Sequence, residues 1–211
     1  MSPTAPAARP AKKAAAAPAS LPGYAGKLLR VNLSTGKIWT QPWAEDMREY
    51  LGGIGLGAKI LYEEVGPKVH WDHPDNRLIL ATGPLAGLPV WGTGGLTVIT
   101  RGAQTDGATS TQANGFFGAA LKYSGSDAIV IQGQAKTLSY LYINDDTVEI
   151  RSAAHLKDKD TWETQEALEA EHGLTGHRLS VYSIGPAGEN LVRFAAIQGD
   201  YGHVASKNGW G

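Results

Sequence analysis

The stretch that most constrains the fold of this chain covers residues 112–133 and reads QANGFFGAALKYSGSDAIVIQG. Residues 116–123 have the character of a helix, and Ser124, Gly125 and Ser126 then stop it. Asp127 leads into AIVI, an apolar run with the length and β-branched content of a buried strand. The order of loop, helix, turn and strand predicts a protein that combines helices with sheets.

The loop before this helix has a composition that suits ligand binding. Gln112, Ala113, Asn114 and Gly115 are small or amide-bearing. Backbone N–H groups at the start of a helix lack helical partners, so a loop of this kind can hold an anion. The alternative is an ordinary helix–strand unit of the core in which the glycines allow close packing, and the pattern alone favours that alternative.

Composition limits the class of protein. The chain has 211 residues, 42% of them hydrophobic, and 27 glycines. This indicates one sizeable, loop-rich α+β domain that can bury a core without disulfides or structural metals. A formal charge of −1 gives no reason to expect nucleic acid or an anionic membrane as a partner. No apolar run approaches the roughly 18–20 residues that a spanning helix needs, so we expect a soluble protein.

The chain contains no cysteine, which excludes disulfides, thiolate catalysis and cysteine-ligated iron–sulfur or zinc sites within it. This composition is compatible with a cytoplasmic location. Residues 1–22 are rich in alanine and proline, and we expect them to form a disordered tail ahead of a folded domain over residues 23–211.

Apolar periodicity and turn residues predict the other elements. Two hairpins are expected, one around Ser34, Thr35 and Gly36 and one turning at residues 144–146. A helix capped by Asp160 or Thr161 continues to Glu171 and ends at Gly173. The remaining expected elements are helices over residues 44–51 and 58–65, strands over 77–83, 97–101 and 178–185, a strand or hairpin arm over 191–199, and a long binding-type loop over 84–95.

Three motifs allow a functional and a structural interpretation. The glycines of residues 52–58 can be read as a dinucleotide fingerprint, but a helix rather than a strand precedes them, so helix-entry or close-packing glycines are favoured. His70, Asp72 and His73 are potential metal ligands, although a solvated turn is more typical of such spacing. His203 and Glu189 are expected to have structural roles.

Several blocks of the sequence, taken together, resemble one known family. LLRVNLSTGKI, GGIGLGAKILYEEV, LILATGPLAG, NGFFGAALKYSGSDAIVIQGQA, YLYINDDTVEIRSAAHL and SIGPAGENLVRFAAI closely resemble the N-terminal domain of tungsten-dependent aldehyde ferredoxin oxidoreductases, from about residue 23 to the end. The resemblance implies an α+β fold of two β-sheets with short helices. It also implies a tungstopterin cofactor, a bis-molybdopterin carrying tungsten or molybdenum, with a magnesium ion that bridges the pterin phosphates.

The resemblance also implies which residues approach the cofactor, mostly through backbone groups. Magnesium would be held by the backbone of Gln112 and Ala205. Arg101 is a candidate for supplying positive charge. Family members carry an arginine where Leu96 follows the paired glycines, and Lys207 lies in a run that is usually rich in arginine. The predicted cofactor-binding residues are Thr93, Gly94, Gly95, Arg101, Gln112, Ala113, Asn114, Gly115, Ala205, Ser206 and Lys207.

In the whole family enzyme, an aldehyde is oxidised to a carboxylic acid and electrons pass through the pterin to a [4Fe–4S] cluster and on to ferredoxin. Cysteines for that cluster lie in helical domains beyond the region that this chain resembles. We therefore expect a cysteine-containing partner chain with iron–sulfur domains, and a ferredoxin or ferredoxin-like subunit. The alternative function is a non-catalytic, degenerate binding or assembly module. If Gly115 faces the cofactor, replacing it with valine is expected to reduce cofactor content with little loss of fold.

Overall fold

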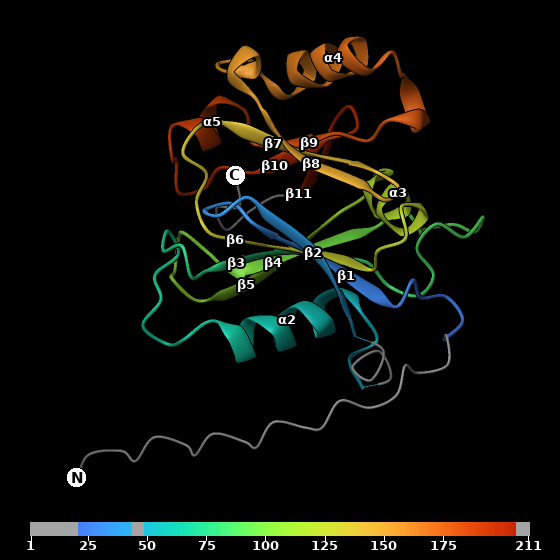
Figure 1. The fold of residues 1–211 in the computed structure, drawn as a ribbon, viewed down its shortest axis with the longest axis vertical. Helices are drawn as coiled ribbons and strands as arrows, with labels where there is room; N and C mark the ends of the chain where they lie inside the picture. Colours follow the sequence, from blue (N-terminus) through green and yellow to red (C-terminus); the bar gives the residue numbers. More distant parts are fainter. Residues whose placement is uncertain (1–20, 44–48, 206–211) are drawn as a thin grey trace.

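The computed structural model describes residues 21–43 and 49–205, arranged in layers (Figure 1). Helix α2 lies under a six-stranded sheet. The β7–β8 hairpin and a three-stranded sheet lie on the other side of that sheet, and α4 covers them. The expected α+β fold with short helices is confirmed. Two β-sheets were expected, and the described residues form three, because the β7–β8 hairpin makes a two-stranded sheet of its own.

The six-stranded sheet has the order β2-β1-β6-β3-β4-β5. Its β1 and β6 are parallel, and its other neighbours are antiparallel. Strands β1, β3, β4 and β6 are mostly buried, because both faces of the sheet are covered. The strands of this sheet are β1 (Lys27–Asn32), β2 (Lys37–Pro42), β3 (Arg77–Ala81), β4 (Leu96–Arg101), β5 (Ala108–Ala113) and β6 (Ala128–Gln132).

The remaining elements are short. The hairpin consists of β7 (Ser139–Asn144) and β8 (Thr147–Ser152), and the three-stranded sheet has the order β11-β10-β9. Its strands are β9 (Tyr182–Ser183), β10 (Ile197–Gly199) and β11 (His203–Ala205). The helices are α2 (Gly53–Glu64), α3 (Phe117–Tyr123), α4 (Thr161–His172) and α5 (Gly185–Glu189), with 3-10 turns η1 (Ala154–Leu156) and η2 (Gly176–Arg178).

The predicted turns and caps are confirmed. Gly36 has a φ of 72° in the β1–β2 turn, and Asp145 has a φ of 51° in the tight β7–β8 turn. Asp160 caps α4, and its carboxylate accepts hydrogen bonds from the N–H groups of Trp162 and Glu163. Gly173 ends that helix in the left-handed conformation.

The glycine-rich stretch lies inside α2 rather than before it, so the expected start of this helix at residue 58 is wrong. A β-carbon at Gly57 would lie 2.3 Å from the side chain of Ile99 on β4, and one at Gly55 would lie 2.4 Å from the carbonyl oxygen of Tyr50. Gly57 therefore lets the helix pack closely on the sheet, and Gly55 lets it pack against the segment that precedes it. The preceding helix is seen only at Glu49 and Tyr50, since residues 44–48 lie outside the described residues.

The least apolar strands were predicted least well. The sequence pattern predicts no strand over Ala108–Ala113, because this segment is polar, and β5 forms there by antiparallel pairing with β4 at the edge of the sheet. The strand expected over residues 178–185 is confined to β9, and the arm expected over residues 191–199 to β10. Most of the predicted tail lies outside the described residues. Within the described ranges, no helix is long and apolar enough to cross a membrane.

Candidate functional site

Three of the predicted cofactor-facing segments converge at one end of the six-stranded sheet. The loop before β4 touches the loop after β5, because a β-carbon on Gly94 would lie 2.0 Å from the carbonyl oxygen of Gly115. One on Gly118 would lie 2.5 Å from the carbonyl oxygen of Gly95. Strand β11, which ends at Ala205, lies beside β5. The backbone around Gly94 and Gly95 therefore packs directly on the backbone around Gly115 and Gly118. Such close packing is expected of loops that hold a ligand through main-chain groups.

We call the place where residues 93–95, residues 112–116 and the end of β11 meet the junction. A buried carboxylate holds its parts together. Asp200, which is 7% exposed, accepts a hydrogen bond from the N–H of Phe116 at 2.7 Å. The Ser180 hydroxyl also donates to this carboxylate at 2.8 Å. Hydrogen bonds to an ionised acceptor are the stronger ones, so Asp200 holds the loop against the three-stranded sheet.

A tyrosine makes the second connection between the loop after β5 and the three-stranded sheet. The Tyr182 hydroxyl on β9 donates a hydrogen bond to the carbonyl oxygen of Asn114. Burial, and second the negative charge of Asp200, raise the pKa of this hydroxyl above its ordinary value of 10.0. The hydroxyl therefore stays protonated near neutral pH and acts as a donor.

Beside the junction is an open hollow of about 490 Å³. The predicted residues Thr93, Gly94 and Gly115 line it, together with aromatic and apolar side chains of the loop after β3 and of α3. The Thr93 hydroxyl donates to the carbonyl oxygens of Leu88 and Val90 and so shapes that loop. The apolar lining includes Leu88, Val90, Trp91, Phe116 and Tyr123, all of which are exposed.

Several predicted residues present free surface at the junction. Gly95 is exposed, and a β-carbon there would have nothing within 4 Å. The side chains of Gln112 and Asn114 are exposed, whereas Ala113 and Ala205 are buried. A flat ligand could approach the backbone at Gly95 without displacing protein atoms. Ser206 and Lys207 lie outside the described residues.

Arg101 is not part of this group. It ends β4, five residues beyond the first residue of that strand, and its Nε atom lies 3.1 Å from Asp106 Oδ1. Its Nη1 atom also donates to the carbonyl oxygen of Gly66, two residues beyond the end of α2. Leu96, at the position where the resemblance leads one to expect arginine, is 1% exposed and belongs to the core.

From the sequence, Gly115→Val is expected to cause little loss of fold, and this expectation is wrong. Gly115 has a φ of 97°, and a β-carbon would lie 2.8 Å from Asp200 Oδ2 and 3.0 Å from the Tyr182 hydroxyl. Valine at this position would therefore break the anchor of the loop itself, whatever the cofactor does.

The polar candidates of the sequence have structural partners. Glu189 accepts a hydrogen bond from the N–H of Asp158 at 3.0 Å, and His203 packs edge-on against Phe116. His70 lies 2.7 Å from Asp106 Oδ2. The described part of the chain contains no group of three or more histidine, aspartate or glutamate side chains that could hold a metal ion.

Sequence reasoning missed the residues that anchor the junction, Asp200, Ser180 and Tyr182. An aspartate two residues before Gly202 indicates a turn, and Asp200 and Tyr201 do have left-handed backbone. The partner at Phe116 lies 84 residues away in the chain, so no local pattern reveals it.

Comparison with known sequences shows which proteins this chain resembles. A family model described as aldehyde ferredoxin oxidoreductase, N-terminal domain, matches residues 28–211. A tungsten-containing aldehyde ferredoxin oxidoreductase of Thermococcus kodakarensis is 44% identical over 190 residues, which cover 90% of this chain and 31% of that protein. An aliphatic sulfonate oxidoreductase, WOR-like subunit, of Pyrococcus furiosus is 35% identical over 206 residues, covering 89% of this chain and 32% of that protein.

A solved structure agrees with the sequence comparison. One chain of the active site complex BamBC of benzoyl coenzyme A reductase, in complex with 1,5-dienoyl-CoA, superposes with a TM-score of 0.84 and 40% identity. The match covers 89% of this chain and 28% of that one. The chain thus spans about a third of the length of the curated relatives it matches.

Proposed function

Because this chain belongs to the aldehyde ferredoxin oxidoreductase family through its N-terminal domain, we propose that it forms the main-chain side of a tungstopterin site. The site would serve an oxidoreductase that converts an aldehyde to a carboxylic acid. The convergence of the three predicted segments beside a hollow is the observation that carries this proposal. The binding domain would comprise residues 23–211.

The residues at the junction suit a large, polar, ring-shaped cofactor. Gly95 offers accessible backbone, and Gln112 and Asn114 offer exposed amides. The backbone carbonyl groups of Gln112 and Ala205 would hold the magnesium ion that accompanies the cofactor. Hard cations of this kind prefer oxygen ligands, so carbonyl groups are suitable donors.

The cofactor and this chain would have different roles in the reaction. When bound, the cofactor supplies the two-electron redox chemistry. The chain's own contribution is to position it, since Asp200 and Tyr182 hold the Asn114–Phe116 backbone in one conformation. Lys207 would add positive charge near the phosphates. Electrons would leave through a [4Fe–4S] cluster that a cysteine-containing partner or further polypeptide carries, and then pass to ferredoxin.

The first experiment measures cofactor content. The chain is purified from its native host with whatever accompanies it, and tungsten, molybdenum and pterin are quantified, the pterin by fluorescence after acid oxidation. Stoichiometric metal and pterin together with a cysteine-containing partner would support the proposal. A folded chain without either would contradict it.

A matched pair of glycine variants tests the contact with the backbone. Gly95→Val adds bulk where the fold leaves open space, so we expect an unchanged melting temperature and at least a several-fold loss of pterin. Gly66→Val adds the same bulk after α2, where a β-carbon would lie 3.8 Å from Val69, and should change neither quantity. Full pterin content in a folded Gly95→Val variant would show that the cofactor does not approach this position.

The alternative is a non-catalytic binding or assembly module. The buried Leu96, at the position where the resemblance leads one to expect an arginine, favours it, because that side chain cannot reach a ligand. Such a module would retain the partner chain and contain neither metal nor pterin in the same preparation.

A further inference from the structure

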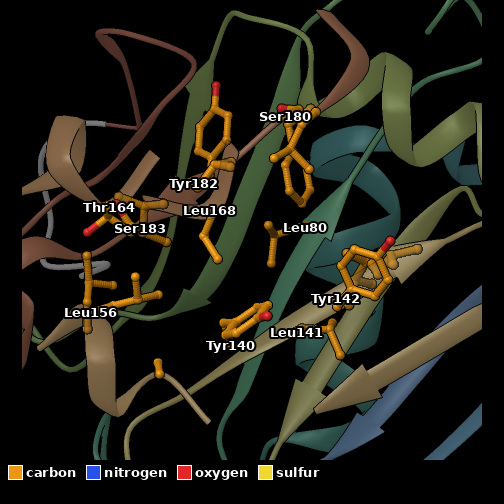
Figure 2. A pocket seen from close by; sticks show the side chains of 18 of the residues that line it. Leu80, Tyr140, Leu141, Tyr142, Leu156, Thr164, Leu168, Ser180, Tyr182 and Ser183 are labelled. Carbon is orange, nitrogen blue, oxygen red and sulfur yellow. The ribbon is translucent and has the colours of Figure 1, made fainter. Parts of the chain in front are cut away.

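Helix α4 presents two different rows of side chains to the rest of the fold. Thr164, Leu168 and His172 line an interior cavity of about 420 Å³, and Figure 2 shows Thr164 and Leu168 beside it. Gln165 and Glu169 do not line this cavity, and yet they are only 2% and 9% exposed. Glutamine and glutamate are seldom buried without hydrogen-bond partners, so this second row must contact polar groups elsewhere.

The partners of the second row lie in the turn between β10 and β11. Gln165 Oε1 accepts a hydrogen bond from the N–H of Tyr201 at 3.1 Å, and Glu169 accepts one from the Tyr201 hydroxyl at 2.7 Å. Gln165 Nε2 also donates to Glu169 at 3.2 Å, so the three residues form one network. Trp162, also on α4, packs against the ring of Tyr201 with centroids 5.4 Å apart. The helix therefore holds both the backbone and the side chain of Tyr201.

The turn that this network holds has an unusual backbone. Asp200, Tyr201 and Gly202 have φ values of 45°, 58° and 115°, so three successive residues have positive φ. Positive φ is uncommon for residues other than glycine, and bulky residues adopt it least readily. Such a conformation persists where the surrounding structure enforces it, and it is frequent at functional sites. The contacts from α4 provide that enforcement.

The backbone of this turn sets the direction of the Asp200 carboxylate. That carboxylate accepts a hydrogen bond from the N–H of Phe116, which directly follows the loop that is predicted to face the cofactor. A change at Tyr201 would turn the neighbouring Asp200 away from this N–H group. We propose, on the basis of the proposed function, that Gln165 and Glu169 are positioning residues for the cofactor-binding loop. They act on the loop through the turn and its carboxylate.

The first test removes the network while keeping the volume of the side chain. Gln165→Met has similar length and shape but cannot donate to Glu169, and it offers Tyr201 only a weak acceptor. We expect hydrogen exchange at the Phe116 amide to become about fivefold faster relative to the amides of β6, which report global unfolding. The same variant, purified from the native host with whatever accompanies it, should lose pterin at least several-fold.

Two further variants separate positioning from stability. Leu168→Ala removes a buried side chain from the same helix but leaves the network intact. It should lower the melting temperature without changing the exchange ratio or the pterin content of the folded chain. The double variant Gln165→Glu with Glu169→Gln exchanges the two groups and can keep each hydrogen bond, because the carboxylate now at position 165 accepts from both Tyr201 and the new amide. It should restore the exchange ratio and the pterin content.

The outcomes distinguish this inference from the proposed function. An unchanged exchange ratio in Gln165→Met, an equal change in Leu168→Ala, or a folded double variant that restores neither quantity would overturn the positioning role. Pterin that is present in the wild type and fully retained in Gln165→Met would overturn this inference alone. A folded wild-type chain without pterin would contradict the proposed function, and the role in cofactor binding with it.

Discussion

At Gly94, two segments of backbone approach so closely that a β-carbon would lie 2.0 Å from the carbonyl oxygen of Gly115. The shape of the proposed cofactor-facing surface is therefore set by the main chain. Asp200 and Tyr182 hold that main chain in place from a different sheet. A substitution at these anchors should loosen the loop without touching any bound group.

Asp200→Asn tests this anchor. Asparagine tolerates the left-handed backbone found at Asp200 but provides only one acceptor oxygen, which Phe116 and Ser180 would have to share. We expect a loss of about 1–2 kcal/mol in the free energy of unfolding and faster hydrogen exchange at the Phe116 amide. Denaturant unfolding and native-state exchange measure both effects.

The control for this variant is Asp146→Asn, since the Asp146 side chain is 98% exposed on the β7–β8 turn. It should change neither quantity. An unchanged exchange rate at Phe116 in Asp200→Asn would mean that the loop does not depend on this carboxylate.

At the scale of single residues, the sequence predicts a contact when the signal is local. The cap at Asp160 and the left-handed Gly173 are both predictable, because each is defined by its own neighbours in the chain. The sequence also predicts the need for glycine at position 115, but not its cause. The close neighbour is Asp200, which lies far along the chain.

At the scale of whole elements, apolar content decided what could be predicted. The strands β3, β4 and β6 are apolar runs, and they were found where expected. Strand β5 is polar, and β9 has two residues. Both depend on pairing with a neighbouring strand rather than on their own pattern, and such pairing cannot be read from a local window.

An ion pair connects three elements at the opposite face of the sheet from the hairpin. Glu64 at the end of α2 accepts two hydrogen bonds from Arg30 on β1, at 2.6 and 2.9 Å, and one from Arg77 on β3 at 2.9 Å. Burial acts to raise the pKa of the Glu64 carboxyl group. The hydrogen bonds and charges of both arginines outweigh burial, and its pKa lies below its ordinary value of 4.5.

This lowered pKa makes the stability of the fold depend on pH. A carboxyl group whose pKa is lower in the folded state stabilises that state above 4.5, and the contribution is lost as the pH falls through the folded value. We expect Glu64→Gln to reduce the free energy of unfolding by roughly 1–3 kcal/mol at neutral pH. Thermal unfolding of both proteins over a range of pH would show the difference shrinking below pH 4.5. A difference that is constant over this range would exclude Glu64 as its source.

At the scale of the whole molecule, the chain accounts for about a third of the length of its relatives. Exposed apolar side chains gather around the hollow beside the proposed cofactor site, and Trp91 is fully exposed there. A cluster of this kind on a protein surface is typical of a place where another polypeptide, a membrane or a ligand binds. We propose that the polypeptide equivalent to the remaining two thirds of the relatives, which would carry the cysteine ligands of the cluster, covers this surface.

Trp91→Ser tests that arrangement. A fully exposed tryptophan adds little to the stability of this chain but is a typical energetic centre of an interface, so its loss should reduce capture of the cysteine-containing partner at least tenfold. The measurement is the amount of partner recovered with a tagged chain from the native host. Tyr62→Ser on α2 removes another exposed aromatic side chain that does not line the hollow, and it should leave recovery unchanged. If both variants retain the partner equally, the partner binds elsewhere. If only Trp91→Ser loses it, the hollow beside Gly94 and Gly115 lies at the boundary between the two polypeptides, where a cofactor held by both would be shielded from water.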